Sequence, residues 1–208
     1  MFLELKNINF KYNNFSLKKI NFSFKKNWVY LISWPSWSWK STLLKIIWWF
    51  LKINSWEILF KQKNLYSLNK KDFLEYKQKI IGFSYQKLNL INNLTIKENI
   101  ELKAKIENLK IDKKWEKYLL EYFELSNLEN KKITEISWWQ ALRVSIIKSL
   151  ILKPKILLLD EPESWLDKRL TKKLINFEKK YAKNNLVIIS SHYFDNKKDS
   201  LNIEKLDL

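Results

Sequence analysis

A single glycine in 208 residues is the feature that most limits what this chain can fold into. Glycine supplies left-handed turns and close backbone approaches, and ordinary proteins contain about 7% of it, which would be roughly 15 residues here. The chain instead contains 11 tryptophans. Three of them stand in SWPSWSWKST, from Ser33 to Thr42, directly after the apolar run VYLI. The largest side chain therefore recurs where we expect the backbone to turn most tightly.

The length and the absence of cysteine narrow the class of protein. A chain of 208 residues can bury a substantial core as one domain. Without cysteine there are no disulfides and no thiolate metal sites, which is compatible with a reducing compartment. The start, MFLELKNINF, lacks the pattern of a signal peptide. The longest apolar run, Leu43–Leu51, contains Lys45 and is shorter than the ~20 residues that span a bilayer.

The net charge of +17 has two interpretations. A basic chain can bind nucleic acid or an anionic membrane surface. Alternatively, the charge reflects a lysine-rich coding bias, because lysines are scattered along the whole chain and arginine occurs only at Arg143 and Arg169. The scattering favours the second interpretation, so we predict no specific nucleic-acid partner.

Candidate strands alternate with candidate helices along most of the chain, which favours an α/β fold with a mostly parallel sheet. The strand-like segments are Phe2–Tyr12, Trp28–Ser33, Trp56–Phe60, Ile80–Gln86, the run KILLLDEP from Lys155, and Leu186–His192. The helical segments are Thr42–Leu51, the middle from about Leu94 to Leu128, Ala141–Leu152, and a helix lined by Leu170, Leu174, Phe177 and Tyr181. The middle helices interrupt the alternation as an inserted subdomain would.

The segment before Lys40 has the spacing of a phosphate-binding loop. Such a loop has the form G-x-x-x-x-G-K-[ST] after a buried strand, and its glycines let backbone N–H groups point at phosphates beside a helix N-terminus. Trp34 and Trp39 occupy the two glycine positions, before Lys40 and Ser41. Reading tryptophan as glycine gives SGPSGSGKST, which is a complete loop between a strand and a helix.

The same replacement completes three further stretches. ISWWQALRVSIIKSL becomes ISGGQALRVSIIKSL, DEPESWLD becomes DEPESGLD, and IIWWFLKINSWEILF becomes IIGGFLKINSGEILF. With these motifs, nearly the whole chain resembles the nucleotide-binding subunit of ATP-binding cassette (ABC) transporters. Ten tryptophans stand where that family commonly carries glycine: Trp28, Trp34, Trp37, Trp39, Trp48, Trp49, Trp56, Trp138, Trp139 and Trp165. Trp115 lies in a region too variable to judge.

We interpret these tryptophans as UGA codons that the organism decodes as glycine. Some bacterial genetic codes read UGA as tryptophan and others read it as glycine, so translation with the wrong table would produce this pattern. Gly82 would come from an ordinary glycine codon. The alternative is a genuine tryptophan-rich chain that has lost ATP binding, or a basic binding protein without enzymatic activity.

The resemblance implies a fold and a division of the chain. It implies a P-loop NTPase (RecA-like) core with a mostly parallel sheet, an antiparallel β edge and an inserted helical subdomain, in one domain over residues 1–208. The core would comprise residues 1–86 and 141–208. The helical subdomain would comprise residues 87–140 and would end in the family's signature motif.

The resemblance also implies the residues that bind ATP and Mg²⁺. Lys40 would reach the β- and γ-phosphates. Tyr12 would stack on adenine, although a strand aromatic also suits a core. The other phosphate-loop positions are Trp34, Ser36, Trp37, Ser38, Trp39, Ser41 and Thr42. The Mg²⁺ ligands would be Ser41, Gln86 and Asp160.

Three residues would act in catalysis. Glu161 would be the general base that polarises the attacking water. Gln86, in the family's Q-loop, would touch Mg²⁺ and the water and couple to a membrane partner. His192 would be the switch histidine that contacts the γ-phosphate; a lone histidine is otherwise a surface or core residue. Glu163 departs from the small hydroxyl residue common at its position, and nothing in the sequence explains it.

Two segments would complete the site of a second nucleotide-binding subunit. The signature, Ser137, Trp138, Trp139 and Gln140, would be read as SGGQ and would meet ATP held by that subunit. The D-loop, Ser164, Trp165, Leu166 and Asp167, would contact the same subunit. The dimer would be a homodimer or a heterodimer.

The function that the resemblance implies is ATP hydrolysis that powers a membrane transporter, with the exporter and lipoprotein-release type favoured by the helical middle and NLTIKENI. A separate membrane-spanning permease would be the partner, which would place the chain peripherally on the cytoplasmic face of the membrane. The alternative is a soluble ABC-type ATPase that acts on nucleic acid or ribosomes, although such proteins usually carry two cassettes.

Overall fold

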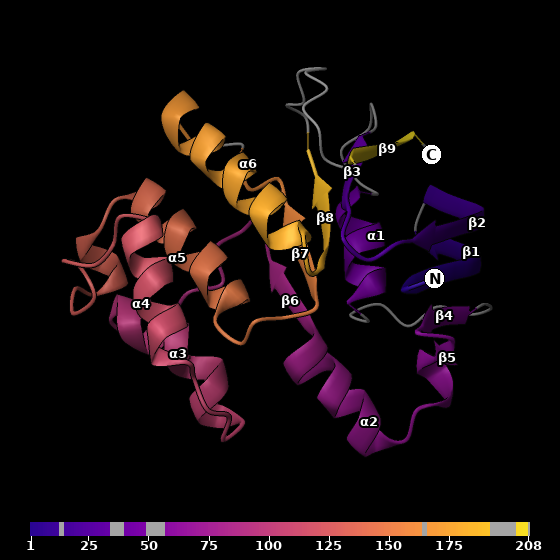
Figure 1. The fold of residues 1–208 in the computed structure, drawn as a ribbon, viewed down its shortest axis with the longest axis horizontal. Coiled ribbons are helices and arrows are strands. Elements are labelled where there is room, and N and C mark those ends of the chain that lie inside the picture. Colours follow the sequence, from indigo (N-terminus) through magenta and orange to yellow (C-terminus); the bar gives the residue numbers. More distant parts are fainter. Residues whose placement is uncertain (13–14, 34–39, 49–56, 164–165, 192–202, 208) are drawn as a thin grey trace.

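The computed structural model describes residues 1–12, 15–33, 40–48, 57–163, 166–191 and 203–207, and it contains two sheets (Figure 1). A five-stranded parallel sheet has the order β6-β7-β8-β3-β9 and comprises β6 (Ile81–Ser84), β7 (Ile156–Asp160), β8 (Leu186–Ser190), β3 (Val29–Ser33) and β9 (Ile203–Asp207). A four-stranded antiparallel sheet has the order β2-β1-β4-β5 and comprises β2 (Phe15–Phe24), β1 (Leu3–Tyr12), β4 (Glu57–Phe60) and β5 (Lys63–Asn64). The predicted α/β fold is confirmed, with the antiparallel strands in a sheet of their own.

The helices lie on both sides of the parallel sheet (Figure 1). They are α1 (Lys40–Ile47), α2 (Lys70–Glu75), α3 (Ile96–Ile106), α4 (Lys113–Tyr122), α5 (Trp138–Leu150) and α6 (Lys168–Ala182). The predicted helix Thr42–Leu51 begins two residues earlier, at Lys40, and its last three residues lie outside the described ranges. The predicted helical middle consists of α3 and α4. No helix in the described ranges is both long and apolar enough to cross a bilayer.

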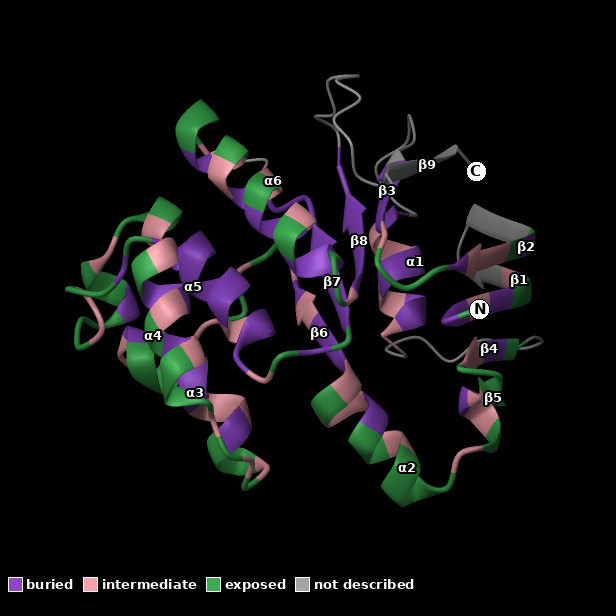
Figure 2. Cartoon of the chain, viewed as in Figure 1, coloured by how far each residue is buried: buried purple, intermediate pink, exposed green. Residues whose placement is uncertain are grey.

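The central strands are buried on both faces, which explains their continuous apolar sequence. Figure 2 shows that β7 and β8 are buried along their length. Alternate residues of β7, β8 and β3 belong to two separate cores. Leu157, Val187 and Leu31 pack with α3, α4, α5 and α6. Leu158 and Ile188 pack on the other face with α1 and the antiparallel sheet. The central strands β3, β8 and β7 are therefore packed between two hydrophobic cores, one on each face of the sheet.

Gly82 is the chain's one glycine, and it lies in β6 where no side chain fits. A Cβ at this position would lie 2.2 Å from the carbonyl oxygen of Ser149 and 2.7 Å from Cγ of Pro154. The contact with Ser149 is to backbone, in α5, so it cannot be relieved by a rotamer change. Glycine here permits the close approach of β6 and α5.

We therefore expect Gly82→Ala to destabilise the protein by about 1–3 kcal/mol, the usual cost of forcing extra volume into a packed interior. Chemical denaturation measures this change. Glu121→Ala, at a site on α4 whose side chain is 57% exposed, is the control and is expected to change stability by no more than about 0.5 kcal/mol. Equal stability of the two variants would contradict the close packing of β6 on α5.

Candidate functional site

The candidate site lies at the carboxyl ends of the central parallel strands, where α/β proteins commonly bind ligands. β7 ends at Asp160 and β8 ends at Ser190, and these residues are partners in the parallel register. Helix α1 packs against both strands and begins at Lys40. The fold thus brings Lys40, Ser41 and Asp160 together from segments more than a hundred residues apart.

Asp160 is buried and accepts two hydrogen bonds from hydroxyl groups. Ser41 Oγ donates to its Oδ1 at 2.9 Å, and Ser190 Oγ donates to the same oxygen at 2.6 Å. Hydroxyl and carboxylate oxygens are the donors that Mg²⁺ prefers, and Mg²⁺ commonly takes only one or two such protein ligands beside phosphates and water. The pair Ser41 and Asp160 therefore fits the Mg²⁺ site that was predicted for it.

Glu161 is held by two of the other predicted site residues. Its Oε1 lies 3.7 Å from Nζ of Lys40, and its Oε2 accepts a hydrogen bond of 2.9 Å from Nε2 of Gln86. Lys40 is 1% exposed, and burial lowers its pKa, while the carboxylates of Glu161 and Asp160 oppose that shift. The ammonium group and the carboxylate thus neutralise each other inside the site.

The backbone also fixes Glu161. Its φ is 49°, in the left-handed region that is uncommon for residues other than glycine. Its N–H donates to both the carbonyl oxygen and the hydroxyl of Ser190, each at 3.0 Å. Backbone conformations of this kind persist where the surroundings determine them, often at functional sites. Ser190 therefore orients both acidic residues, although the sequence analysis did not single it out.

Glu163 has a structural partner that explains its presence. Its Oε1 accepts a hydrogen bond from Oγ of Ser191, the residue that follows β8. Its carbonyl oxygen accepts from the N–H of Leu166, in the predicted D-loop. Glu163 thus links the loop after β7 to the loop after β8. The two consecutive serines at the end of an apolar strand were the available sequence signal.

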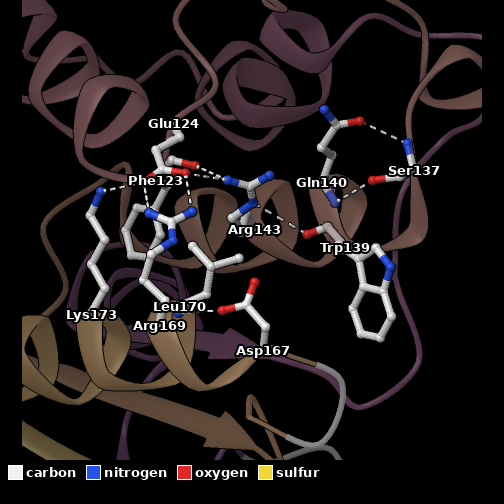
Figure 3. A network of polar contacts seen from close by, with 10 residues as sticks. All are labelled: Phe123, Glu124, Ser137, Trp139, Gln140, Arg143, Asp167, Arg169, Leu170 and Lys173. Carbon is white, nitrogen blue, oxygen red and sulfur yellow. Dashed lines mark hydrogen bonds and ion pairs between the residues drawn. The ribbon is translucent and has the colours of Figure 1, made fainter.

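The signature residues form the start of α5 (Figure 3). Ser137 Oγ accepts from the N–H of Gln140 at 3.2 Å, and Gln140 Oε1 accepts from the N–H of Ser137 at 2.8 Å. This reciprocal capping box fixes the geometry of the N-terminus of α5. Trp138 and Trp139 are 50% and 47% exposed. Their indoles therefore project from the segment that is predicted to approach a second subunit's phosphates.

Of the remaining predicted site residues, some lie within the residues that the structure describes and others lie outside them. Thr42 lies in the first turn of α1 and is half-buried, and Asp167 caps α6 through a 2.8 Å hydrogen bond from the N–H of Leu170. Tyr12 is the last residue of β1. The positions outside the described residues are Trp34, Ser36, Trp37, Ser38, Trp39, Ser164, Trp165 and His192.

Comparison with known proteins identifies the relatives of this chain. Residues 17–164 match the ABC transporter family. The ABC transporter ATP-binding protein YxdL of Bacillus subtilis is 35% identical over 82% of this chain and 68% of its own length. The spermidine/putrescine import ATP-binding protein PotA of Mycoplasma capricolum is 37% identical over 82% of this chain and 48% of its own length. The lipoprotein-releasing system ATP-binding protein LolD of Leptospira interrogans is 34% identical over 68% of this chain and 60% of its own length. This chain thus spans about half to two thirds of the length of these relatives.

A solved structure agrees with the sequence relatives. The dimeric ATP-binding cassette MJ0796, described in a post-hydrolysis state bound to ADP and Pi, is 28% identical and superposes with a TM-score of 0.79 over 92% of this chain and 88% of that chain. The matched family and the superposed fold agree. This chain therefore belongs to the ABC transporter family and contains its ATP-binding cassette.

Proposed function

We propose that this chain binds and hydrolyses ATP and so powers a membrane transporter. The observation that carries the proposal is the cluster of Lys40, Ser41, Gln86, Asp160 and Glu161 at the carboxyl ends of β6 and β7. These residues were predicted from three separate sequence motifs: the phosphate loop, the Q-loop and the run that ends in Asp160 and Glu161. Their convergence supports a phosphate-transfer site rather than a chance match of one motif.

The contacts suggest how the residues share the reaction. Lys40 Nζ would bind the β- and γ-phosphate oxygens, which removes it from Glu161. Ser41 and Asp160 would hold Mg²⁺, which neutralises phosphate charge as the reaction proceeds. Glu161, released from Lys40 and positioned by the amide of Gln86, would accept a proton from the attacking water. The water oxygen bonds to the γ-phosphorus while the bond to the ADP oxygen breaks, yielding ADP and inorganic phosphate.

The proposed active form is a dimer of two nucleotide-binding subunits. Ser137 caps the N-terminus of α5, and a helix N-terminus attracts phosphate through its free N–H groups and dipole. In the proposed dimer this end would meet ATP held by the other subunit, with Leu166 and Asp167 beside it. We further propose that residues 87–140 act as the helical subdomain of one domain over 1–208, since α3 and α4 share a continuous core with the parallel sheet.

Replacing Glu161 tests the mechanism. We expect Glu161→Gln to bind ATP normally but to hydrolyse it at least about 100-fold more slowly, because an amide cannot accept the proton. The ATP-bound variant should accumulate as a dimer. Nucleotide binding by fluorescence, phosphate release and light scattering measure the three properties.

Two lysine variants complete this experiment. Lys40→Ala should abolish ATP binding, because it removes the buried cation beside the phosphates, whereas Lys45→Ala, further along α1, should leave binding unchanged. Normal ATP affinity in Lys40→Ala would remove the phosphate-loop assignment. Undiminished turnover in Glu161→Gln would transfer the role of base to another residue, with His192 as the next candidate.

The proposed partner is a membrane-spanning permease bound near Gln86 and the helical middle. This association would place the chain on the cytoplasmic face of the membrane, where a permease and ATP meet. We propose the exporter or lipoprotein-release type, supported by the helical middle and by similarity to LolD. PotA, an import protein by its name, is similar at a comparable identity, so identification of the permease is needed to assign the direction of transport.

Capture from membranes tests this partner. An affinity-tagged chain should recover a polytopic membrane protein from detergent-solubilised membranes of its own organism. Mass spectrometry of the captured material identifies the partner and, through it, the type of transporter. Recovery of ribosomes or nucleic acid in place of a membrane protein would favour the alternative function.

We also propose that ten of the tryptophans are glycine in the native protein. The exposure of the adjacent Trp138 and Trp139 supports this, since large exposed indoles gain little from packing. Trp115 is a contrasting position, because its Nε1 donates to the carbonyl oxygen of Leu150 at 3.0 Å and its ring stacks on Tyr118. We propose that Trp115 is a true tryptophan.

Peptide mass spectrometry of the native protein decides the decoding. Cleavage after lysine and arginine gives peptide 27–40, with four of the tryptophan positions, and peptide 133–143, with Trp138 and Trp139. Each glycine lowers the peptide mass by one large, fixed step. We expect glycine at all six positions and tryptophan at Trp115. Tryptophan at Trp34 and Trp39 would contradict both the recoding and a functional phosphate loop.

A further inference from the structure

A single carboxylate, Glu124, joins three helices behind the predicted dimer-facing segments (Figure 3). Its Oε1 accepts from Nη1 of Arg169 at 2.6 Å and from Nζ of Lys173 at 2.9 Å. Its Oε2 accepts from Nη2 of Arg169 at 2.9 Å and from Nη1 of Arg143 at 3.5 Å. Glu124 follows α4, Arg143 lies in α5, and the other two cations lie in α6.

The choice of cations is informative in this chain. It has 39 basic residues, and only two of them are arginines. Both of those arginines bind Glu124. Arginine offers a planar fork that holds a carboxylate through two parallel hydrogen bonds, which lysine cannot do. Arg169 uses this fork on the two oxygens of Glu124, whereas Arg143 adds one contact of 3.5 Å.

The backbone at Glu124 gives a second, independent observation. Helix α4 ends in a Schellman motif, in which the N–H of Leu125 donates to the carbonyl oxygen of Leu120 and the N–H of Glu124 donates to that of Glu121. Glu124 has a φ of 59°, the left-handed conformation that favours glycine at this position. The position therefore carries a glutamate side chain in spite of the backbone preference.

The contacts of Arg143 extend the cluster to the signature. Its Nη1 donates to the buried carbonyl oxygen of Phe123 at 2.8 Å, and its Nε donates to the carbonyl oxygen of Trp139 at 3.4 Å. Trp139 is part of the predicted signature segment. On the other side, Arg169 lies in the first turn of α6, two residues after Asp167, which caps that helix.

We propose that Glu124 is a positioning residue that locks the signature end of α5 to the start of α6. The two segments that would face the second subunit's ATP then move as one unit. This inference rests on the proposed function, and it adds a residue outside the predicted ATP-binding and catalytic motifs.

The electrostatics support a lock that stays closed at physiological pH. Hydrogen bonds from Arg169 and Lys173 lower the pKa of Glu124 to about 2. Its side chain is 36% exposed, so added salt screens these interactions. The lock is therefore expected to weaken with ionic strength rather than with mild acid.

Two spin labels measure the lock directly, because the chain has no cysteine. Thr134→Cys, before the signature, and Lys172→Cys, on α6, are exposed labelling sites. We expect a narrow distance distribution that Glu124→Gln broadens. Glu124→Gly should broaden it equally while suiting the left-handed backbone, which separates the lock from any folding defect. Glu121→Gln, on α4, is the matched control and should change nothing.

The kinetic test compares the effect of the substitution on ATP affinity with its effect on the rate of ATP hydrolysis. In protein carrying the native residues, Glu124→Gln should lower the rate at saturating ATP by about five- to tenfold, the size typical of coupled ionic pairs, with monomer ATP affinity unchanged. An unchanged distance distribution or an unchanged rate would overturn the inference. A wild-type chain without ATPase activity would contradict the proposed function alone, because the label distances test Glu124 without nucleotide.

Discussion

The parallel hydrogen-bonded ladder of β3, β8 and β7 is the constraint on which the rest of the structure depends. Its strands are apolar on both faces, so they are stable only between two hydrophobic cores, and the chain provides α3–α6 on one face and α1 with the antiparallel sheet on the other. Because the strands run in parallel, Asp160 and Ser190 end at the same edge. Every contact at the candidate site, from Ser41 to Gln86, is made around that edge.

The sequence predicted what depends on long apolar runs and on motifs, and it missed what depends on tertiary contacts. The run that ends in Asp160 and Glu161 indicated both the central strand and the acidic pair. Strand β2 and helix α2 were not predicted. The alternation of Ile20, Phe22 and Phe24 did indicate β2 and was missed, whereas α2 is a short, mostly polar helix without a periodic pattern. The role of Ser190 could not be predicted either, because it arises from the register of β8 against β7. The start of α1 at Lys40 was also missed, because Lys40 and Ser41 are polar and precede the apolar run.

The scarcity of glycine restricts this fold less at its turns than at its close approaches. Nine described residues other than glycine have positive φ, among them Asn7, Asn27 and Asn108. Asparagine tolerates the left-handed region because its short side chain bonds locally. Gly82, in contrast, has ordinary φ and is required because a Cβ would strike the backbone of α5. We therefore expect tryptophan at positions 34 and 39 to impair a phosphate loop mainly because the indole side chains occupy the space that the phosphates need, and less because of a left-handed backbone.

In so basic a chain, the carboxylates carry more information than the lysines. With 39 basic and 22 acidic residues, a lysine near any surface feature is expected by chance. A carboxylate that is buried or shared by several donors is not. Asp160 collects two hydroxyls, Glu161 a lysine and an amide, and Glu124 both arginines. The first two lie where phosphate would bind and the third contacts the signature helix, so these three acidic residues mark the proposed path from ATP to the second subunit.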